Sequence, residues 1–348
     1  MEETLLESYT EYCISRTTAL LAIDSPTGYT DAAADDVLRE LTALGYAPQR
    51  TVKGGVLCCL GGADDRDAVL LEAHVDTLGG MVCQILPEGG LRISPLRGLN
   101  PNNAEGENVR VVTKDRGVLE GTFQLENASI HVNGKYNETA RAFDKMEVVL
   151  DADARDKEAV EKLGVAPGDI VCFEPRTRIT PTGFIKSRFL DDKLSVGILL
   201  GYARYLREQQ ITPARTVWVH VTVYEEVGHG GCAPVPDGVT EGISVDMGCV
   251  GRELTCREQQ VSICAKDSHG PYAYAVVQGL IAAARRAGVD YAVDVYPHYG
   301  SDVEETLSAG ADIRHGLIGA GVYASHGYER AHREGVKNTF KLLCAYLG

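Results

Sequence analysis

The segment AVLLEAHVD (residues 68–76) decides the fold that we expect for this chain of 348 residues. Its apolar run is typical of a β-strand. The near-continuous apolar run TVWVHVTVY (216–224) is typical of a strand that is buried on both faces of a sheet, and before it Val196, Leu199, Leu200, Ala203 and Leu206 recur at helical spacing. The pattern predicts an α/β domain in which helices sandwich a mixed β-sheet.

A segment of different texture interrupts this α/β pattern. From Pro87 to Arg176 the chain is punctuated by turn-rich stretches such as NPNN, NASIHVNG and APGD, which separate short β-rich runs. A chain of this length also exceeds the size at which one hydrophobic core keeps growing, so two units are expected. We predict an α/β domain formed by residues 1–86 and 177–348, with a small β-rich domain inserted at residues 87–176.

The charge and the cysteines exclude several classes of protein. The formal net charge is -15, which disfavours a nucleic acid as partner because nucleic-acid binders present a basic surface to the phosphates. Charged and hydroxyl side chains interrupt the N-terminal segment, so it predicts neither a signal peptide nor a membrane span. The ten cysteines form no CxxC pair, and reduced thiols of this kind indicate a cytoplasmic protein.

Polar side chains capable of binding metal follow four of the predicted strands. His74 and Asp76 stand at the end of AVLLEAHVD, and Glu225 and Glu226 directly follow TVWVHVTVY. Asp246 ends GISVD (242–246), and His326 ends HGLIGAGVYASH (315–326). Asp191 and Asp192 stand in a turn, RFLDDK, directly before a predicted helix. Because the carboxyl ends of parallel strands line one crevice of an open sheet, we expect these side chains to converge there.

A cluster of carboxylates of this kind requires cations, because the carboxylates repel one another and raise each other's pKa. Taken singly, a residue such as His74 is more often a core or turn histidine than a ligand, and an aspartate pair such as Asp191 and Asp192 more often caps the helix that follows. Their joint placement after strands favours a shared metal site. Two histidines among carboxylates suit zinc, cobalt or manganese better than calcium, which prefers oxygen ligands alone.

Five short words in the chain together resemble the M42 family of metallo-aminopeptidases, relatives of the wider clan of peptidases with two cocatalytic zinc ions. They are AHVDTLG (73–79), FLDDK (189–193), YEEVG (224–228), SVDMG (244–248) and SHGYERAH (325–332). Their order and spacing, and the insertion between the first two, are similar to those of the family. The phrases LNPNNAEGE and KDSHGPY (266–272) support the resemblance.

The resemblance implies a role for each site residue. Asp191 would bridge two divalent ions, with zinc the first choice and cobalt or manganese as alternatives. His74 and Asp246 would complete one ion, and Glu226 and His326 the other. Glu225 would act as general base, and Asp76 would orient the imidazole of His74. The resemblance also implies a cis peptide between Asp191 and Asp192.

The family further implies an aminopeptidase that acts on short peptides and assembles through its insertion into a homo-oligomer of twelve chains. A metallo-carboxypeptidase or an amide deacylase of the same clan, and a non-catalytic binding protein of the same fold, are the alternatives. Thr77 and Leu78, and His229 and Gly230, depart from the residues common in the family beside the metal-binding words. The preferred substrate side chain and the role of His229 therefore stay open.

Overall fold

The computed structural model describes residues 2–348, which form two compact units. The first unit comprises the segment that ends at Asp76 together with Arg176–Gly348, and the second comprises Thr77–Pro175. The first boundary lies ten residues before the predicted one at Pro87. The chain enters the second unit directly after Asp76 because the next strand, β4 (Gly79–Ile85), pairs with strands of that unit.

The first unit is built on a mixed sheet of 12 strands. These strands are β1 (Gln49–Arg50), β2 (Val56–Gly61), β3 (Ala68–His74), β10 (Arg178–Ile179), β11 (Phe184–Ser187), β12 (Val217–Thr222), β13 (Val239–Val245), β14 (Gly248–Val250), β15 (Val261–Lys266), β16 (Tyr291–Val295), β17 (Arg314–Tyr323) and β18 (Glu329–His332). The main path through the sheet runs β1-β2-β12-β3-β13-β17-β18-β11-β10.

Four adjacent strands at the centre of this path, β12, β3, β13 and β17, are parallel to one another. Every residue of β3 is buried, as expected for a strand that is covered on both faces. The carboxyl ends of the four strands consequently lie at one edge of the sheet. The predicted α/β class and the predicted common edge are both confirmed.

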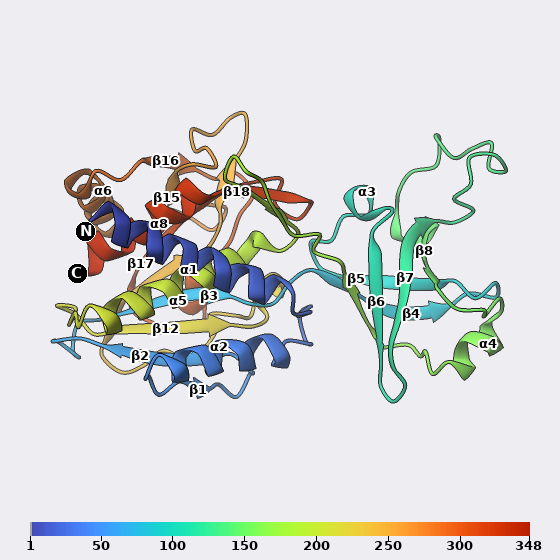
Figure 1. Cartoon of the computed structure of the whole chain (residues 1–348), viewed down its shortest axis with the longest axis horizontal. Helices are drawn as coiled ribbons and strands as arrows, with labels where there is room; N and C mark the ends of the chain where they lie inside the picture. The colour runs from blue at the N-terminus through green and yellow to red at the C-terminus, as the bar shows by residue number, and fades with distance from the viewer. Residues whose placement is uncertain (1) are drawn as a thin grey trace. The chain divides into compact units, whose positions relative to one another are not determined.

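Helices cover both faces of the sheet. They are α1 (Glu3–Leu21), α2 (Asp31–Ala43), α5 (Leu190–Glu208), α6 (Tyr274–Ala287), α7 (Asp302–Ser308) and α8 (Arg333–Leu347). Helix α1 contacts α5, α5 contacts α8, and α8 contacts α6, so these four helices form one layer (Figure 1). Helix α7 lies on the opposite face, where its Val303 amide donates to Ser244 of β13. On the other face, Val276 and Leu280 of α6 lie over Gly316 of β17, the residue that pairs with Ile243 of β13. Within residues 2–348, none of the helices combines the length and hydropathy that a membrane span requires.

Helices α1 and α5 pack unusually closely because two glycines of α5 face α1. A Cβ atom at Gly197 would lie 2.7 Å from the Cys13 carbonyl oxygen, and one at Gly201 would lie 2.2 Å from the Cys13 sulfur. The buried ammonium group of Lys193 donates to the carbonyls of Leu20 (3.0 Å) and Ile23 (2.6 Å) at the end of α1. These contacts fix the start of α5, where Asp191 and Asp192 lie.

The second unit is a closed barrel of six strands. The barrel consists of β4, β5 (Leu91–Leu96), β8 (Met146–Leu150), β7 (Gly117–Leu125), β6 (Asn108–Thr113) and β9 (Ile170–Phe173), in that order, and it also carries α3 (Pro101–Ala104), η1 (Phe143–Lys145) and α4 (Lys157–Lys162). Alternate side chains fill its interior, where the rings of Phe123 and Phe173 meet edge to face at 5.6 Å. The predicted inserted unit is therefore rich in β-structure.

Candidate metal centre

The side chains predicted to bind metal follow the parallel strands at their shared edge. His74 is the last residue of β3, Asp246 comes directly after β13, and His326 comes three residues after β17. Glu225 and Glu226 follow β12 in the 3-10 turn η2 (Glu225–Val227), and Asp191 lies in the first turn of α5.

Asp191 lies between the two histidines. Its Oδ1 is 3.2 Å from His74 Nε2, and its Oδ2 is 3.6 Å from His326 Nε2. His326 Nε2 is also 3.6 Å from Glu226 Oε2. His74, Asp191 and Asp246 each offer one ligand atom, and these three atoms all lie within 4.8 Å of one another. The fold thus brings the five predicted ligands together around one carboxylate.

The peptide bond between Asp191 and Asp192 is cis, which confirms the expectation from the family resemblance. The Asp192 carboxylate contacts the end of β3, where its Oδ2 accepts the backbone N–H of His74 at 3.2 Å. The side chain of His74 is 1% exposed, whereas that of His326 is 41% exposed. The cluster therefore opens to solvent beside His326.

Asp76 contacts this cluster in two ways. Its backbone carbonyl accepts the Nδ1–H of His74 at 2.9 Å, which leaves Nε2 directed at Asp191. Its carboxylate, 3.6 Å from His74 Nδ1, accepts the backbone N–H groups of Glu225 (3.1 Å) and Glu226 (3.4 Å) and the hydroxyl of Thr27 (2.7 Å). The family resemblance implied that the Asp76 carboxylate orients His74, but in this geometry the Asp76 carbonyl makes the shorter contact with the imidazole.

Glu225 and Glu226 diverge for a different reason than the sequence suggested. We expected the alternation of a strand to send them in opposite directions, but β12 ends at Thr222. Tyr224 then adopts a left-handed conformation (φ 74°), and the two glutamates follow in the 3-10 turn. Glu226 approaches His326, and Glu225 Oε2 lies 3.6 Å from His74 Nε2.

Glu329 is a buried residue of the site that the sequence analysis missed. One of its carboxylate oxygens accepts the backbone N–H of Asp191 and the other that of His326, both at 3.1 Å. It therefore holds the two ligand-bearing backbones that meet at Asp191. Its position three residues after His326, inside the word SHGYERAH, was the signal available in the sequence.

Unusual backbone conformations are concentrated around the cluster. Within residues 2–348, eight residues other than glycine have positive φ. One of them is the candidate ligand His326, and three more lie within two residues of a candidate ligand: Phe189, Tyr224 and Ala324. Left-handed conformations are disfavoured for side chains with a Cβ atom and persist only where the surrounding structure imposes them. The turns that carry the ligands are therefore held in place by their contacts.

Burial dominates the electrostatics of these carboxyl groups. It raises the pKa of Glu225 and of Glu226 well above the usual value, and the charges of Asp246 and Asp191 respectively raise them further. Burial and the charge of Asp191 raise the pKa of Asp246 to about 7. Burial opposes the charged form of His74, but Glu225 and the hydrogen bond to Asp191 outweigh it, so the pKa of His74 is raised well above its usual value.

The donor set fits divalent metal ions. Imidazole nitrogens and carboxylate oxygens converge at distances of 3.2–3.6 Å, and burial penalises the ionised carboxylates unless a cation accompanies them. The residues that could hold such ions are His74, Asp191, Glu226, Asp246 and His326.

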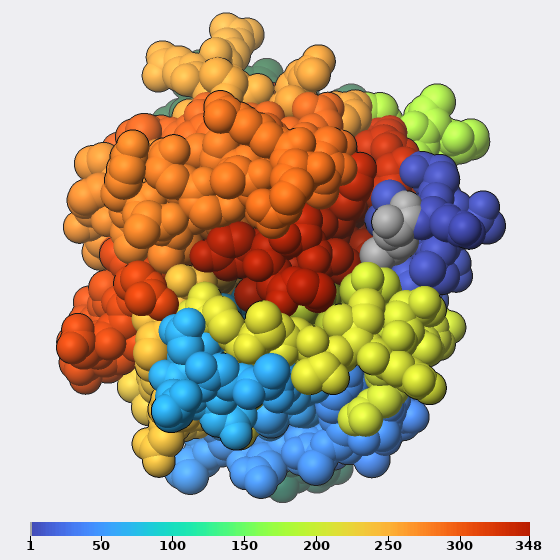
Figure 2. Space-filling view, turned by 90° about the vertical axis from the view of Figure 1, so that its left-hand side faces the viewer, coloured from blue at the N-terminus to red at the C-terminus, as the bar shows by residue number. Residues whose placement is uncertain are grey.

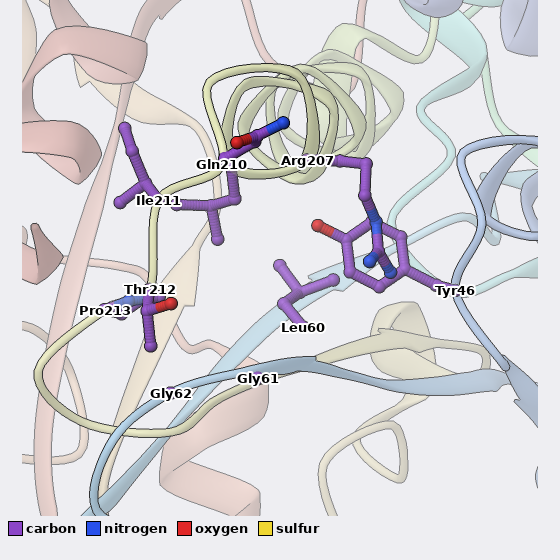
Figure 3. A pocket seen from close by; sticks show the side chains of 10 residues that line it. Tyr46, Leu60, Gly61, Gly62, Arg207, Gln210, Ile211, Thr212 and Pro213 are labelled. Carbon is purple, nitrogen blue, oxygen red and sulfur yellow. The ribbon is translucent and has the colours of Figure 1, made fainter.

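A separate pocket of about 470 Å³ lies between the C-terminal end of α5 and the end of β2. Tyr46, Leu60, Arg207 and Pro213 are among its lining residues, and Figure 3 shows the Arg207 guanidinium beside the Tyr46 ring, at 4.1 Å. Figure 2 shows the two chain segments that border it, one blue and one yellow, side by side. None of the candidate metal ligands lines this pocket.

The amino-acid sequence matches the family described as M42 glutamyl aminopeptidase over residues 54–342. The putative aminopeptidase YhfE of Bacillus subtilis is 38% identical over 328 residues, which cover 94% of this chain and 95% of that protein. The lysyl aminopeptidase of Pyrococcus furiosus is 25% identical over 180 residues, which cover 51% of this chain and 50% of that protein.

Solved structures of TET peptidases share the fold. The TET aminopeptidase of Thaumarchaeota archaeon SCGC AB-539-E09 superposes with a TM-score of 0.88 at 18% identity, covering 97% of this chain and 96% of that one. The TET1 peptidase of Pyrococcus horikoshii, which can assemble into a tetrahedron or a large octahedral shell, gives a TM-score of 0.84 at 20% identity, covering 96% and 98%.

Substitution of Glu329 tests whether its carboxylate positions the turns that carry Asp191 and His326. In Glu329→Gln one carboxylate oxygen becomes an NH₂ group, which cannot accept the N–H of Asp191 or His326. Partners that orient metal ligands typically contribute about 10- to 100-fold to metal affinity, so we expect a loss of that size. Bound metal is measured after dialysis against a graded series of chelator concentrations. Glu253→Gln, at an exposed position, is the control, and equal retention by both variants would contradict the assignment.

Proposed function

The chain belongs to the M42 family of aminopeptidases, and from this premise we propose that its cluster around Asp191 binds two divalent ions and hydrolyses the N-terminal bond of short peptides. The observation that carries the proposal is the position of Asp191, whose two carboxylate oxygens face two different histidines. A carboxylate in that position can bridge two ions, with one oxygen to each.

The proposed ligands divide into two sets around this bridge. His74 and Asp246 complete the coordination of the first ion together with Asp191. The ligand atoms of these three residues lie within 4.8 Å of one another, which supports this assignment. Glu226 and His326 complete the coordination of the second ion. This assignment is supported by His326 Nε2, which lies 3.6 Å from both Glu226 and Asp191. Imidazole and carboxylate ligands suit zinc, so zinc is the ion that we propose.

Glu225 is the proposed general base. Divalent ions bound here would supply a lowered pKa for an attacking water and polarisation of the scissile carbonyl. Glu225 takes the proton of that water and returns it to the leaving amine. Its position supports this role, because its backbone N–H is held by Asp76 and its Oε2 lies 3.6 Å from His74 Nε2.

Burial favours this proton transfer. It raises the pKa of Glu225 well above the usual value, so the carboxylate holds an acquired proton more firmly than an exposed glutamate would. A glutamate with a raised pKa is a stronger base toward water than an exposed glutamate, and it then serves as the acid that protonates the leaving group. Acidic groups around the cluster also favour a substrate that carries a free, positively charged α-amine.

We extend the proposal to the assembly and location of the protein. Large apolar side chains are exposed on the barrel unit at Val118, Ile130, Val132 and Val149, as expected for a surface that contacts other chains. This supports a homo-oligomer formed through the barrel, with twelve chains as in the tetrahedral family assembly. All ten cysteines are free thiols, which supports a cytoplasmic location.

Analytical ultracentrifugation of the full chain tests the assembly. We expect a species of about twelve chains of 37.5 kDa each. The double variant Ile130→Lys, Val132→Lys should sediment as a smaller species because it places charge on the proposed contact surface. Val52→Lys, an exposed apolar site of the other unit, should leave the assembly unchanged. A wild type that stays monomeric at micromolar concentration would refute the proposal.

Removal of metal, combined with a panel of peptides, tests the reaction itself. Purified protein should carry close to two divalent ions per chain, and chelation should abolish hydrolysis until metal is restored. The metal-loaded protein is incubated with peptides that have free or acetylated N-termini, and the products are identified by mass. Only free N-termini should be trimmed, one residue at a time. Release of C-terminal residues would indicate a carboxypeptidase, and cleavage of acyl groups a deacylase.

Paired substitutions separate the two adjacent glutamates. Glu225→Gln should keep both metal ions, since the amide preserves size, but turnover should fall by roughly 10²- to 10⁴-fold because the amide cannot accept a proton. Glu226→Gln should instead bind one ion weakly and regain part of its activity in excess metal. Metal titration during peptide hydrolysis distinguishes the two. The opposite pattern, with Glu225→Gln rescued by metal, would reverse the assignment.

A further inference from the structure

A second group of metal-competent side chains lies at the word KDSHGPY, which the proposed reaction does not use. Asp267 and His269 belong to the loop between β15 and α6, and Glu304 lies in the first turn of α7. One ligand atom from each of the three lies within 4.8 Å of the other two. His269 Nδ1 is 3.6 Å from Glu304 Oε2 and 4.0 Å from Asp267 Oδ1.

The loop that carries Asp267 and His269 is held in this conformation. Asp267 is fully buried; its Oδ1 accepts the N–H groups of His269 (2.8 Å) and Gly270 (3.4 Å), and its Oδ2 accepts the Tyr272 hydroxyl (2.7 Å). A Cβ atom at Gly300 would lie 2.7 Å from Cε1 of His269, so the absence of a side chain there gives the imidazole its place.

Glu304 is flanked by imidazoles on both sides. Its second oxygen, Oε1, lies 3.6 Å from Nε2 of His315, at the start of β17. The ring of His315 packs against the ring of Tyr272 at 5.1 Å, and Tyr272 in turn binds Asp267. Both carboxylates and both histidines are thus parts of one connected group.

The spacing of these groups matches that of metal ligands better than that of hydrogen-bonded partners. The side-chain separations of 3.6–4.0 Å exceed hydrogen-bond length, and they resemble the 3.6 Å separations around His326. Ligands about 2.0–2.1 Å from a tetrahedral zinc ion lie about 3.3 Å apart. Within residues 2–348, neither Asp267 nor Glu304 has a lysine or arginine within ion-pair distance, so a cation would supply the charge that is missing.

We propose that Asp267, His269 and Glu304 form a further binding site for a divalent cation of the zinc class, with His315 orienting Glu304 and water completing the coordination. Imidazole with two carboxylates is a donor set that suits zinc rather than calcium or magnesium. His269 is 61% exposed at its side chain, so the ion can enter from solvent.

The ion at this site would have a structural effect near the proposed catalytic centre. Ser268 ties its loop to the loop at residues 297–301: its hydroxyl accepts the N–H of Tyr299 at 2.8 Å, and its amide donates to the carbonyl of Tyr299 at 3.2 Å. The hydroxyl of Tyr299 donates to the carbonyl of Met247 at 3.0 Å, next to Asp246. A cation that joins the loop of Asp267 and His269 to Glu304 of α7, the helix that directly follows residues 297–301, would hold Tyr299, and through it the turn after β13.

Calorimetric titration with Zn²⁺ tests this site directly. The full chain is first saturated at its higher-affinity sites, and additional Zn²⁺ is then titrated in. We expect one further ion per chain in the wild type, and its loss in both His269→Asn and Glu304→Gln. His298→Asn, which removes an exposed histidine of the neighbouring loop, should keep the further ion. Equilibrium dialysis with elemental analysis gives the same count independently of heat.

Two outcomes would overturn the proposal. The first is a wild type that binds no Zn²⁺ beyond the ions needed for hydrolysis, and the second is further binding that His269→Asn and Glu304→Gln both retain. Circular dichroism of each variant shows whether it is folded. Because hydrolysis is measured separately, loss of this ion and failure of the proposed reaction are distinguishable.

Discussion

The rest of the first unit depends on one constraint, the burial of several carboxyl groups at the shared edge of four parallel strands. Charged groups that lose water destabilise a fold unless opposite charge or hydrogen-bond donors accompany them. Here backbone N–H groups satisfy Asp76 and Glu329, while Asp191 lies between two imidazoles. The remaining charge is of the kind that divalent ions neutralise, so metal binding and the folded geometry of this edge are expected to stabilise each other.

The centre of the sheet could be predicted because its signals are local. A strand buried on both faces has to be apolar along its length, and the polar residues at its end stand out against that run. Parallel pairing then brings His74, Asp246 and His326 to one edge whatever the intervening loops do. The family resemblance supplied the bridging role of Asp191 and the cis bond, which no periodicity indicates.

Other features could not be predicted because they depend on turns and long-range contacts. The boundary between the units fell at Thr77 rather than Pro87, since β4 looks the same in sequence whether it joins the sheet or the barrel. The 3-10 turn at Glu225 follows from the left-handed Tyr224 and from amides that bind Asp76. Glu329 looks like an ordinary polar residue until the fold brings Asp191, 138 positions away, onto its carboxylate.

The hold of Asp76 on two backbone amides has a consequence for how the protein can evolve. Because Asp76 holds the main chain of Glu225, the proposed base, side chains further along that loop can change without displacing it. The side chain of His229 is exposed, whereas a Cβ atom at Gly230 would lie 2.1 Å from Asp302 Oδ1. The loop therefore combines a frame that main-chain contacts fix with an exposed side chain at His229, where a substitution would leave that frame in place.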